Sequence, residues 1–112
     1  MTVNMITLLS NRNNDWFEDN LVNVPPLIRK YSGDYVAFST TMRKLEGVIP
    51  RPHQAAIFTF PSLEAIEDLM SCDEYKPCAA IRKANAEAEM FVFEGDESLL
   101  EEARKFWAAG AE

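Results

Sequence analysis

The sequence has few of the residues that build metal sites, disulfide frameworks and phosphate-binding loops. It has one histidine, His53, and two cysteines, Cys72 and Cys78, in 112 residues. Their spacing is not typical of metal ligands, and one short loop between cysteines would add little to a chain long enough to fold without disulfides. Both cysteines are therefore predicted to be reduced thiols. The four glycines are scattered, which excludes a glycine-rich phosphate loop.

Long apolar runs and a basic surface are also lacking. No run reaches the roughly 18 to 20 apolar residues that span a bilayer, and residues 1–11 lack the pattern of a signal peptide, so a cytoplasmic location is expected. Eleven Lys and Arg oppose 18 Asp and Glu, a net charge of −7. This disfavours nucleic-acid binding, because an acidic surface repels phosphates. The remaining composition, 47% hydrophobic and 26% charged, is typical of one globular domain.

The hydrophobic pattern predicts an α+β fold with the order β-α-β-β-α-β and a further C-terminal helix. This is the ferredoxin-like pattern, in which right-handed crossovers place both main helices on one face of a four-stranded antiparallel sheet. We predict a ferredoxin-like domain over residues 1–95 and a helical extension over residues 96–112. The expected strands cover residues 3–9, 35–47, 54–60 and 89–94, and the expected helices cover residues 16–31, 63–70, 77–88 and 99–107.

Local signals mark the helix ends. Pro25 and Pro26 are predicted to kink or restart the first helix, because proline removes a backbone donor and clashes one turn back. The other signals are Asp15 and Ser62 as N-caps, Ser98 with Glu101 as a capping box, and Gly33 as a left-handed C-cap.

The strands are apolar on both faces, whereas a sheet with one solvated face alternates apolar and polar residues. In the third strand Phe58 and Phe60 point one way, while Ala55 and Ile57 point the other. Two helices cover only one face, so the other would expose more apolar area than a monomer tolerates. A second copy packed sheet to sheet is the expected cover, and the C-terminal helix is the alternative. We therefore predict a homodimer through the open sheet face.

Several short motifs, in this order and spacing, resemble one known family. The resemblance, over residues 3–95, is to the domain of unknown function 1330 family within the dimeric α+β barrel superfamily. It implies two ferredoxin-like sheets packed face to face. The motifs are Pro25-Pro26-Leu27-Ile28 with Lys30-Tyr31, Gly33 and Tyr35, then Leu45-Glu46-Gly47, Phe60-Pro61-Ser62, and Glu74-Tyr75 with Pro77 and Arg82.

Five residues are candidates for chemistry. His53, whose ordinary pKa lies near neutrality, is the candidate acid or base, and Glu46 near the same turn is predicted to orient it. Arg51 has the fork of donors that binds a carboxylate. Tyr75 and Arg82 are seven residues apart on a predicted helix, so they share a face and could line a cleft. Each also has a structural interpretation: solvated turn residues for the first three, and packing with an ion pair for the last two.

Two functions from different classes remain open. One is the binding or transformation of a small organic molecule in a cleft between sheet and helices. The other is a non-catalytic dimeric module with a structural or interaction role. No cofactor motif or metal-ligand set is visible, so the sequence predicts neither a cofactor nor a metal, and it does not name a substrate.

Overall fold

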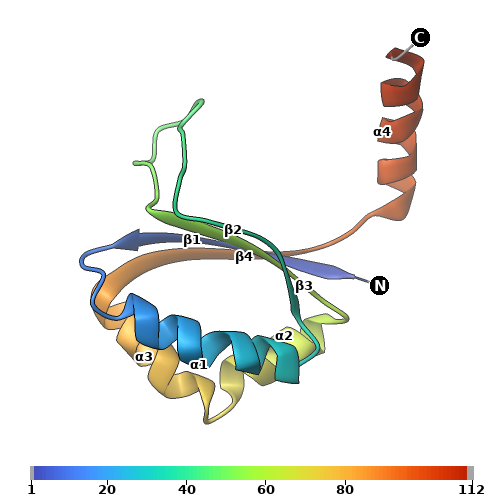
Figure 1. Ribbon diagram of the computed structural model, residues 1–112. Coiled ribbons are helices and arrows are strands. Elements are labelled where there is room, and N and C mark those ends of the chain that lie inside the picture. The colour runs from blue at the N-terminus through green and yellow to red at the C-terminus, as the bar shows by residue number, and fades with distance from the viewer. Residues whose placement is uncertain (1, 111–112) are drawn as a thin grey trace.

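The computed structural model describes residues 2–110 and contains a four-stranded sheet with three helices against one face (Figure 1). The strand order is β2-β3-β1-β4 and every neighbouring pair is antiparallel, which confirms the predicted ferredoxin-like α+β fold. In chain order the elements are β1 (Val3–Asn11), α1 (Phe17–Lys30), β2 (Asp34–Ser39), β3 (Gln54–Phe60), α2 (Leu63–Ser71), α3 (Tyr75–Asn85), β4 (Ala86–Glu94) and α4 (Glu97–Gly110).

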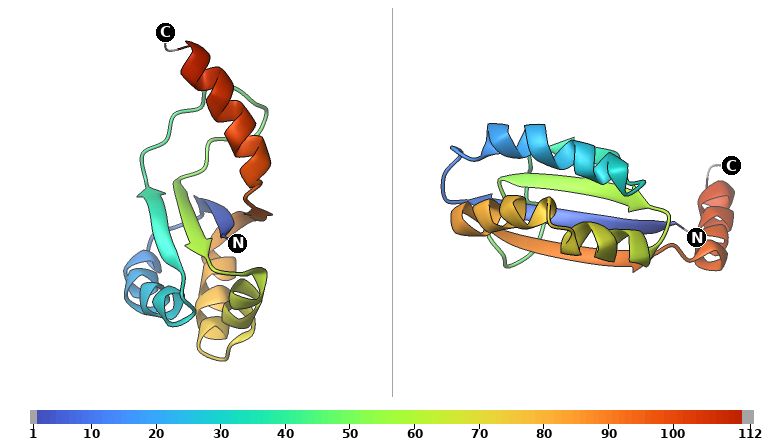
Figure 2. Two further views of the ribbon diagram at one scale, coloured as in Figure 1. Left: turned by 90° about the vertical axis from the view of Figure 1, so that its right-hand side faces the viewer. Right: turned by 90° about the horizontal axis from the view of Figure 1, so that it is seen from below.

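The core lies between the sheet and the helices α1, α2 and α3; α2 and α3 follow each other in one line, and α1 lies alongside them (Figure 2). Strand alternation puts Met5 opposite Phe58 on this side, and both side chains are buried. Phe60 and Leu69 are among the most deeply buried residues. The predicted helices over residues 63–70 and 77–88 correspond to α2 and α3, which a turn at residues 72–74 separates.

The opposite face of the sheet is also apolar, as the sequence predicts. Ile6 pairs with Ile57 on one side and with Phe91 on the other, so these side chains point away from the helices. Phe91 and Phe93 are 60% and 48% exposed. We refer to this surface as the open face; its apolar residues are Ile6, Leu8, Ala37, Ala55, Ile57, Phe91 and Phe93.

Helix α4 does not cover the open face of its own chain. It stands beyond the end of β4 and rises from the side of the sheet opposite the other helices (Figure 1). None of its residues is buried. The radius of gyration is 16.4 Å, whereas about 13 Å is typical of a compact chain of this length, and the projecting α4 and residues 40–53 account for the excess.

Several element boundaries differ from the sequence prediction, and strand pairing explains two of them. The second strand ends at Ser39 and not at Gly47, because its partner β3 begins at Gln54 and residues beyond Ser39 have no strand to pair with. The fourth strand begins at Ala86 and not at Glu89, because β1 continues to Asn11 and pairs with Ala86 there.

Helix α1 runs without interruption through Pro25 and Pro26, so the predicted restart is wrong. The two prolines leave the carbonyls of Leu21 and Val22 without their helical donors. Both of these residues are exposed, so water can satisfy the carbonyls. The buried residues Leu27 and Ile28 hold the last turn of the helix against the sheet.

The helix caps are partly as predicted. The hydroxyl of Ser62 accepts a hydrogen bond from the Ala65 backbone N–H, which confirms it as the N-cap of α2. Asp15 does not cap α1, since Trp16 occupies that position without a side-chain bond. The residue with left-handed backbone before β2 is Ser32, with φ 65°, and not Gly33.

Helix α4 is capped by Asp96 and not by Ser98. The Asp96 carboxylate accepts bonds from the Leu99 backbone N–H at 3.0 Å and from the Ser98 hydroxyl at 2.9 Å. Ser98 lies inside the helix, one position after its first residue, so it cannot be the cap. The Leu99 N–H first, and the Ser98 hydroxyl second, lower the pKa of Asp96 below its usual 3.8.

Asp96→Ala is expected to reduce the helicity of α4 at neutral pH. Because the folded pKa is depressed, the stabilisation is fully present above 3.8 and is lost as the pH falls through the lower, folded value. An exposed helix of 14 residues is marginal by itself, so the missing cap should unwind part of it. Circular dichroism of both proteins against pH checks this. A difference between them that persists in strong acid would contradict the assignment.

None of the helices within residues 2–110 combines the length and the hydropathy that a membrane-spanning segment needs.

Candidate functional site

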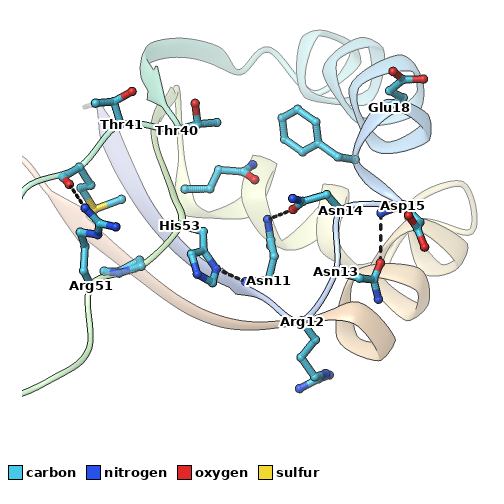
Figure 3. Close-up of a pocket in the computed structure, with 14 residues that line it drawn as sticks. Asn11, Arg12, Asn13, Asn14, Asp15, Glu18, Thr40, Thr41, Arg51 and His53 are labelled. Carbon is cyan, nitrogen blue, oxygen red and sulfur yellow. Dashed lines mark hydrogen bonds between the residues drawn. The ribbon is translucent and has the colours of Figure 1, made fainter.

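A polar hollow of about 960 Å³ lies at the end of the sheet where β1 and β2 finish and β3 begins (Figure 3). Its walls come from the turn before α1, from the first turn of α1 and from both ends of segment 40–53, the irregular stretch between β2 and β3. We call it the His53 pocket. It is lined by Asn11, Arg12, Asn13, Asn14, Asp15, Phe17, Glu18, Thr40, Thr41, Met42, Arg51, Pro52, His53 and Gln54.

Strand β1 fixes the orientation of His53. The backbone N–H of Asn11 donates to Nδ1 of the imidazole at 2.8 Å, and the His53 backbone N–H donates to the Leu9 carbonyl, also at 2.8 Å. Because Nδ1 accepts a hydrogen bond, the neutral ring carries its proton on Nε2. The side chain is exposed yet oriented, so the Nε2–H group can donate a hydrogen bond to a bound molecule.

Arg51 lines the same pocket as His53. One guanidinium nitrogen, Nη1, donates to the Met42 carbonyl at 3.1 Å, which ties the two ends of segment 40–53 together (Figure 3). A guanidinium has five N–H donors, so most of them stay available for a carboxylate or a carbonyl. The acidic side chains of Asp15 and Glu18 line the pocket too, so its walls carry both signs of charge.

Gln54 is the polar residue that the sequence analysis missed. Its side chain is only 5% exposed and lines the His53 pocket, and its amide oxygen has no hydrogen-bond partner within residues 2–110. A buried unpaired acceptor costs roughly 1–3 kcal/mol. The signal was present in the sequence, because Gln54 occupies a helix-side position of β3, in phase with Ala56, Phe58 and Phe60.

The structure brings together two of the five predicted site residues, His53 and Arg51. Glu46 lines a second hollow with Arg51 and is not in the His53 pocket. Tyr75 and Arg82 are buried on α3, 7% and 8% exposed, and line neither hollow; Tyr75 belongs to the main core. The Asn11 backbone holds the imidazole, the role predicted for Glu46. The chemical roles assigned to all five residues stay predictions.

The two-layer architecture and the antiparallel β2-β3-β1-β4 sheet define a ferredoxin-like α+β protein. More narrowly, the chain belongs to the DUF1330 family, a domain of unknown function, whose model matches residues 2–96. The match ends just before α4. No curated protein matches the sequence.

Solved structures support the fold. A protein of unknown function from Rhodopseudomonas palustris, RPA0582, is similar with a TM-score of 0.76 and 14% identity, over 85% of this chain and 82% of that one. SnoaB from Streptomyces nogalater, described as a cofactor-independent oxygenase, has a TM-score of 0.64 and 12% identity, over 85% and 93%. A dimeric ferredoxin-like protein of unknown function from Bacteroides fragilis has a TM-score of 0.55 and 18% identity, over 84% and 96%.

Proposed function

We propose that the protein binds a small polar organic molecule in the His53 pocket. The observation that carries this is the buried amide oxygen of Gln54, which lines the pocket without a partner in the described residues. Buried polar groups are usually paired, so an unpaired acceptor at the wall of a pocket is a natural partner for a ligand donor. A hydroxyl or amide group of a ligand would supply the missing donor.

The other polar groups define the chemistry of that ligand. His53 Nε2–H can donate to a carbonyl or hydroxyl oxygen, and the free donors of Arg51 can hold a carboxylate. A molecule with a hydrogen-bond donor, a carbonyl oxygen and an anionic group would use all three residues. If the molecule is also transformed, His53 would act as the acid or base only after the Asn11 N–H releases Nδ1, because that hydrogen bond holds the neutral ring with its proton on Nε2.

Thermal-shift screening against small aromatic and carboxylic compounds tests this proposal. Gln54→Met removes the unpaired oxygen, so it should raise the unfolding free energy by about 1–2 kcal/mol and abolish the ligand-dependent shift. Thr7→Val is the matched control. Thr7 is buried with an unpaired hydroxyl but does not line the pocket, so this variant should gain stability and keep ligand binding.

His53→Ala should weaken the binding of a compound identified in that screen by about two- to tenfold, because one hydrogen bond is worth roughly 0.5–1.5 kcal/mol. The proposal would be contradicted if no compound stabilises the protein at millimolar concentration, and if the Gln54 and His53 variants respond to the compounds as the wild type does. It would favour the alternative, a non-catalytic dimeric module.

We further propose that the protein acts as a homodimer through the open face. Support comes from the exposed aromatic residues Phe91 and Phe93, which no helix within residues 2–110 covers. Exposed apolar patches of this kind on soluble proteins mark interaction surfaces, and twofold dimers are the commonest assembly. The similar protein from Bacteroides fragilis is described as dimeric, which agrees with this assignment.

A further inference from the structure

Helix α4 presents an uncovered apolar stripe. Leu99, Phe106 and Trp107 are 67%, 75% and 76% exposed, and their spacing places them with Ala103 on one side of the helix. Two exposed aromatic rings on one short helix form a surface that normally contacts another protein. The family match ends at residue 96, so this helix is an addition to the DUF1330 domain.

Segment 40–53 presents a complementary surface at the other end of the sheet. Leu45 and Val48 are 94% and 98% exposed, and Ile49 is 57% exposed. The segment encloses a second hollow of about 380 Å³, the loop hollow, whose floor includes Leu8 of the open face. Segment 40–53 and α4 rise from the same side of the sheet and from opposite ends of the strands (Figures 1 and 2).

The charges of the two surfaces are also complementary. Segment 40–53 carries three basic side chains and only one carboxylate, although the whole chain has a net charge of −7. Helix α4 carries three glutamates and two basic residues, and Asp96 precedes it. Contact between these surfaces would pair opposite charges. Contact between the α4 helices of two copies, or between their two segments 40–53, would instead bring like charges together.

We propose that α4 of one copy docks on segment 40–53 of a second copy, with its aromatic side chains in the partner's loop hollow. This rests on the proposed dimer through the open face. Consider two sheets that face each other and are related by a twofold axis perpendicular to the strands and parallel to the sheets. The strand ends that carry segment 40–53 in one copy then lie over the strand ends that carry α4 in the other copy. A helix of 14 residues is about 21 Å long, whereas packed sheets are about 10 Å apart, so α4 reaches the partner's segment.

The contact also completes the His53 pocket. The loop hollow and the His53 pocket share Met42, Arg51 and Pro52 as a common wall. A helix seated in the loop hollow would press on this wall from the side of the open face. The partner's α4 thus restricts the movement of Arg51, so ligand affinity depends on the second copy.

Two double variants test the docking. The helix variant carries Phe106→Ser and Trp107→Ser, and the loop variant carries Leu45→Asp and Val48→Asp. All four side chains are exposed in one chain, so each variant should fold. The homodimer of either variant loses both contacts between α4 and segment 40–53. Its dissociation constant, measured by sedimentation, should therefore be about 100-fold higher than that of the wild type. Val22→Asp, 70% exposed on α1, is the matched control and should leave dimerisation unchanged.

Mixing the two variants, with one labelled at its N-terminal amine, identifies which surfaces meet. One of the two contacts stays intact in the heterodimer. There the unchanged α4 of the loop variant meets the unchanged segment 40–53 of the helix variant. Its dissociation constant should therefore be about tenfold lower than that of either variant alone. A second readout is the quenching of Trp107 fluorescence by acrylamide, which should be weak in the wild-type dimer and strong in the loop variant. The Trp107→Phe variant gives the contribution of the buried Trp16, which is subtracted.

The outcomes separate the two proposals. A wild-type protein that is monomeric at micromolar concentration overturns the dimer and the docking together. A wild-type dimer that tolerates both double variants overturns only the docking. A third outcome is that the loop variant dimerises normally, the helix variant does not, and mixing the two gives no tighter heterodimer. In that case α4 contacts the α4 of the second copy, and the proposed docking is wrong.

Discussion

If the protein forms the proposed dimer through the open face, Phe91→Glu is expected to convert it into a folded monomer of 12.7 kDa. The side chain is 60% exposed in one chain and points from β4 across the open face, next to Ile6 of β1. In a sheet-to-sheet dimer this ring would be buried, and the twofold axis would repeat the change on the other copy. Lost burial and the cost of a desolvated carboxylate should raise the dissociation constant about 100-fold or more.

Analytical ultracentrifugation over a range of protein concentrations measures the effect. Val22→Glu on the outer surface of α1 adds the same charge at a site that is 70% exposed, and it should leave the dimer intact. Circular dichroism should give the same spectrum for both variants, since neither position contributes to the core. If Phe91→Glu shifts the dissociation constant only a few-fold, the open face is not the dimer interface.

Gly33→Ala is expected to destabilise the fold by about 1–3 kcal/mol. A Cβ at this position would lie 2.7 Å from Cζ of Phe60 and 2.9 Å from Cγ2 of Ile28, well inside van der Waals contact. Both neighbours are almost completely buried, 2% and 3% exposed, so neither can move aside without disturbing the core. Urea denaturation should show a lower midpoint with an unchanged slope.

Gly95→Ala is the matched control for this prediction. No heavy atom lies within 4 Å of a Cβ built on Gly95, and its backbone is not left-handed. The variant should therefore change the unfolding free energy by less than about 0.5 kcal/mol. Equal effects of the two substitutions would mean that Gly33 acts through backbone entropy and not through the close approach of Phe60.

The candidate site was only partly predictable. His53 and Arg51 are near neighbours in the sequence, so a local argument could place them at one turn. Gln54 follows directly, and its phase with Ala56 and Phe58 can be read from the sequence, but only the structure shows that its buried amide oxygen has no donor within residues 2–110. Tyr75 and Arg82 share a helix face as expected, yet that face packs into the core. Periodicity predicts which residues lie together, and the packing of other elements decides what they touch.

The sequence by itself determined the order of the elements, the antiparallel ferredoxin-like sheet and its two apolar faces, because these follow from short-range periodicity. It did not determine where β2 ends or why Gly33 is required. Each of these depends on residues far apart in the chain: the end of β2 at Ser39 on the start of β3, and Gly33 on Phe60. The tertiary structure decided them, since strand pairing and close packing act between segments that no local pattern connects.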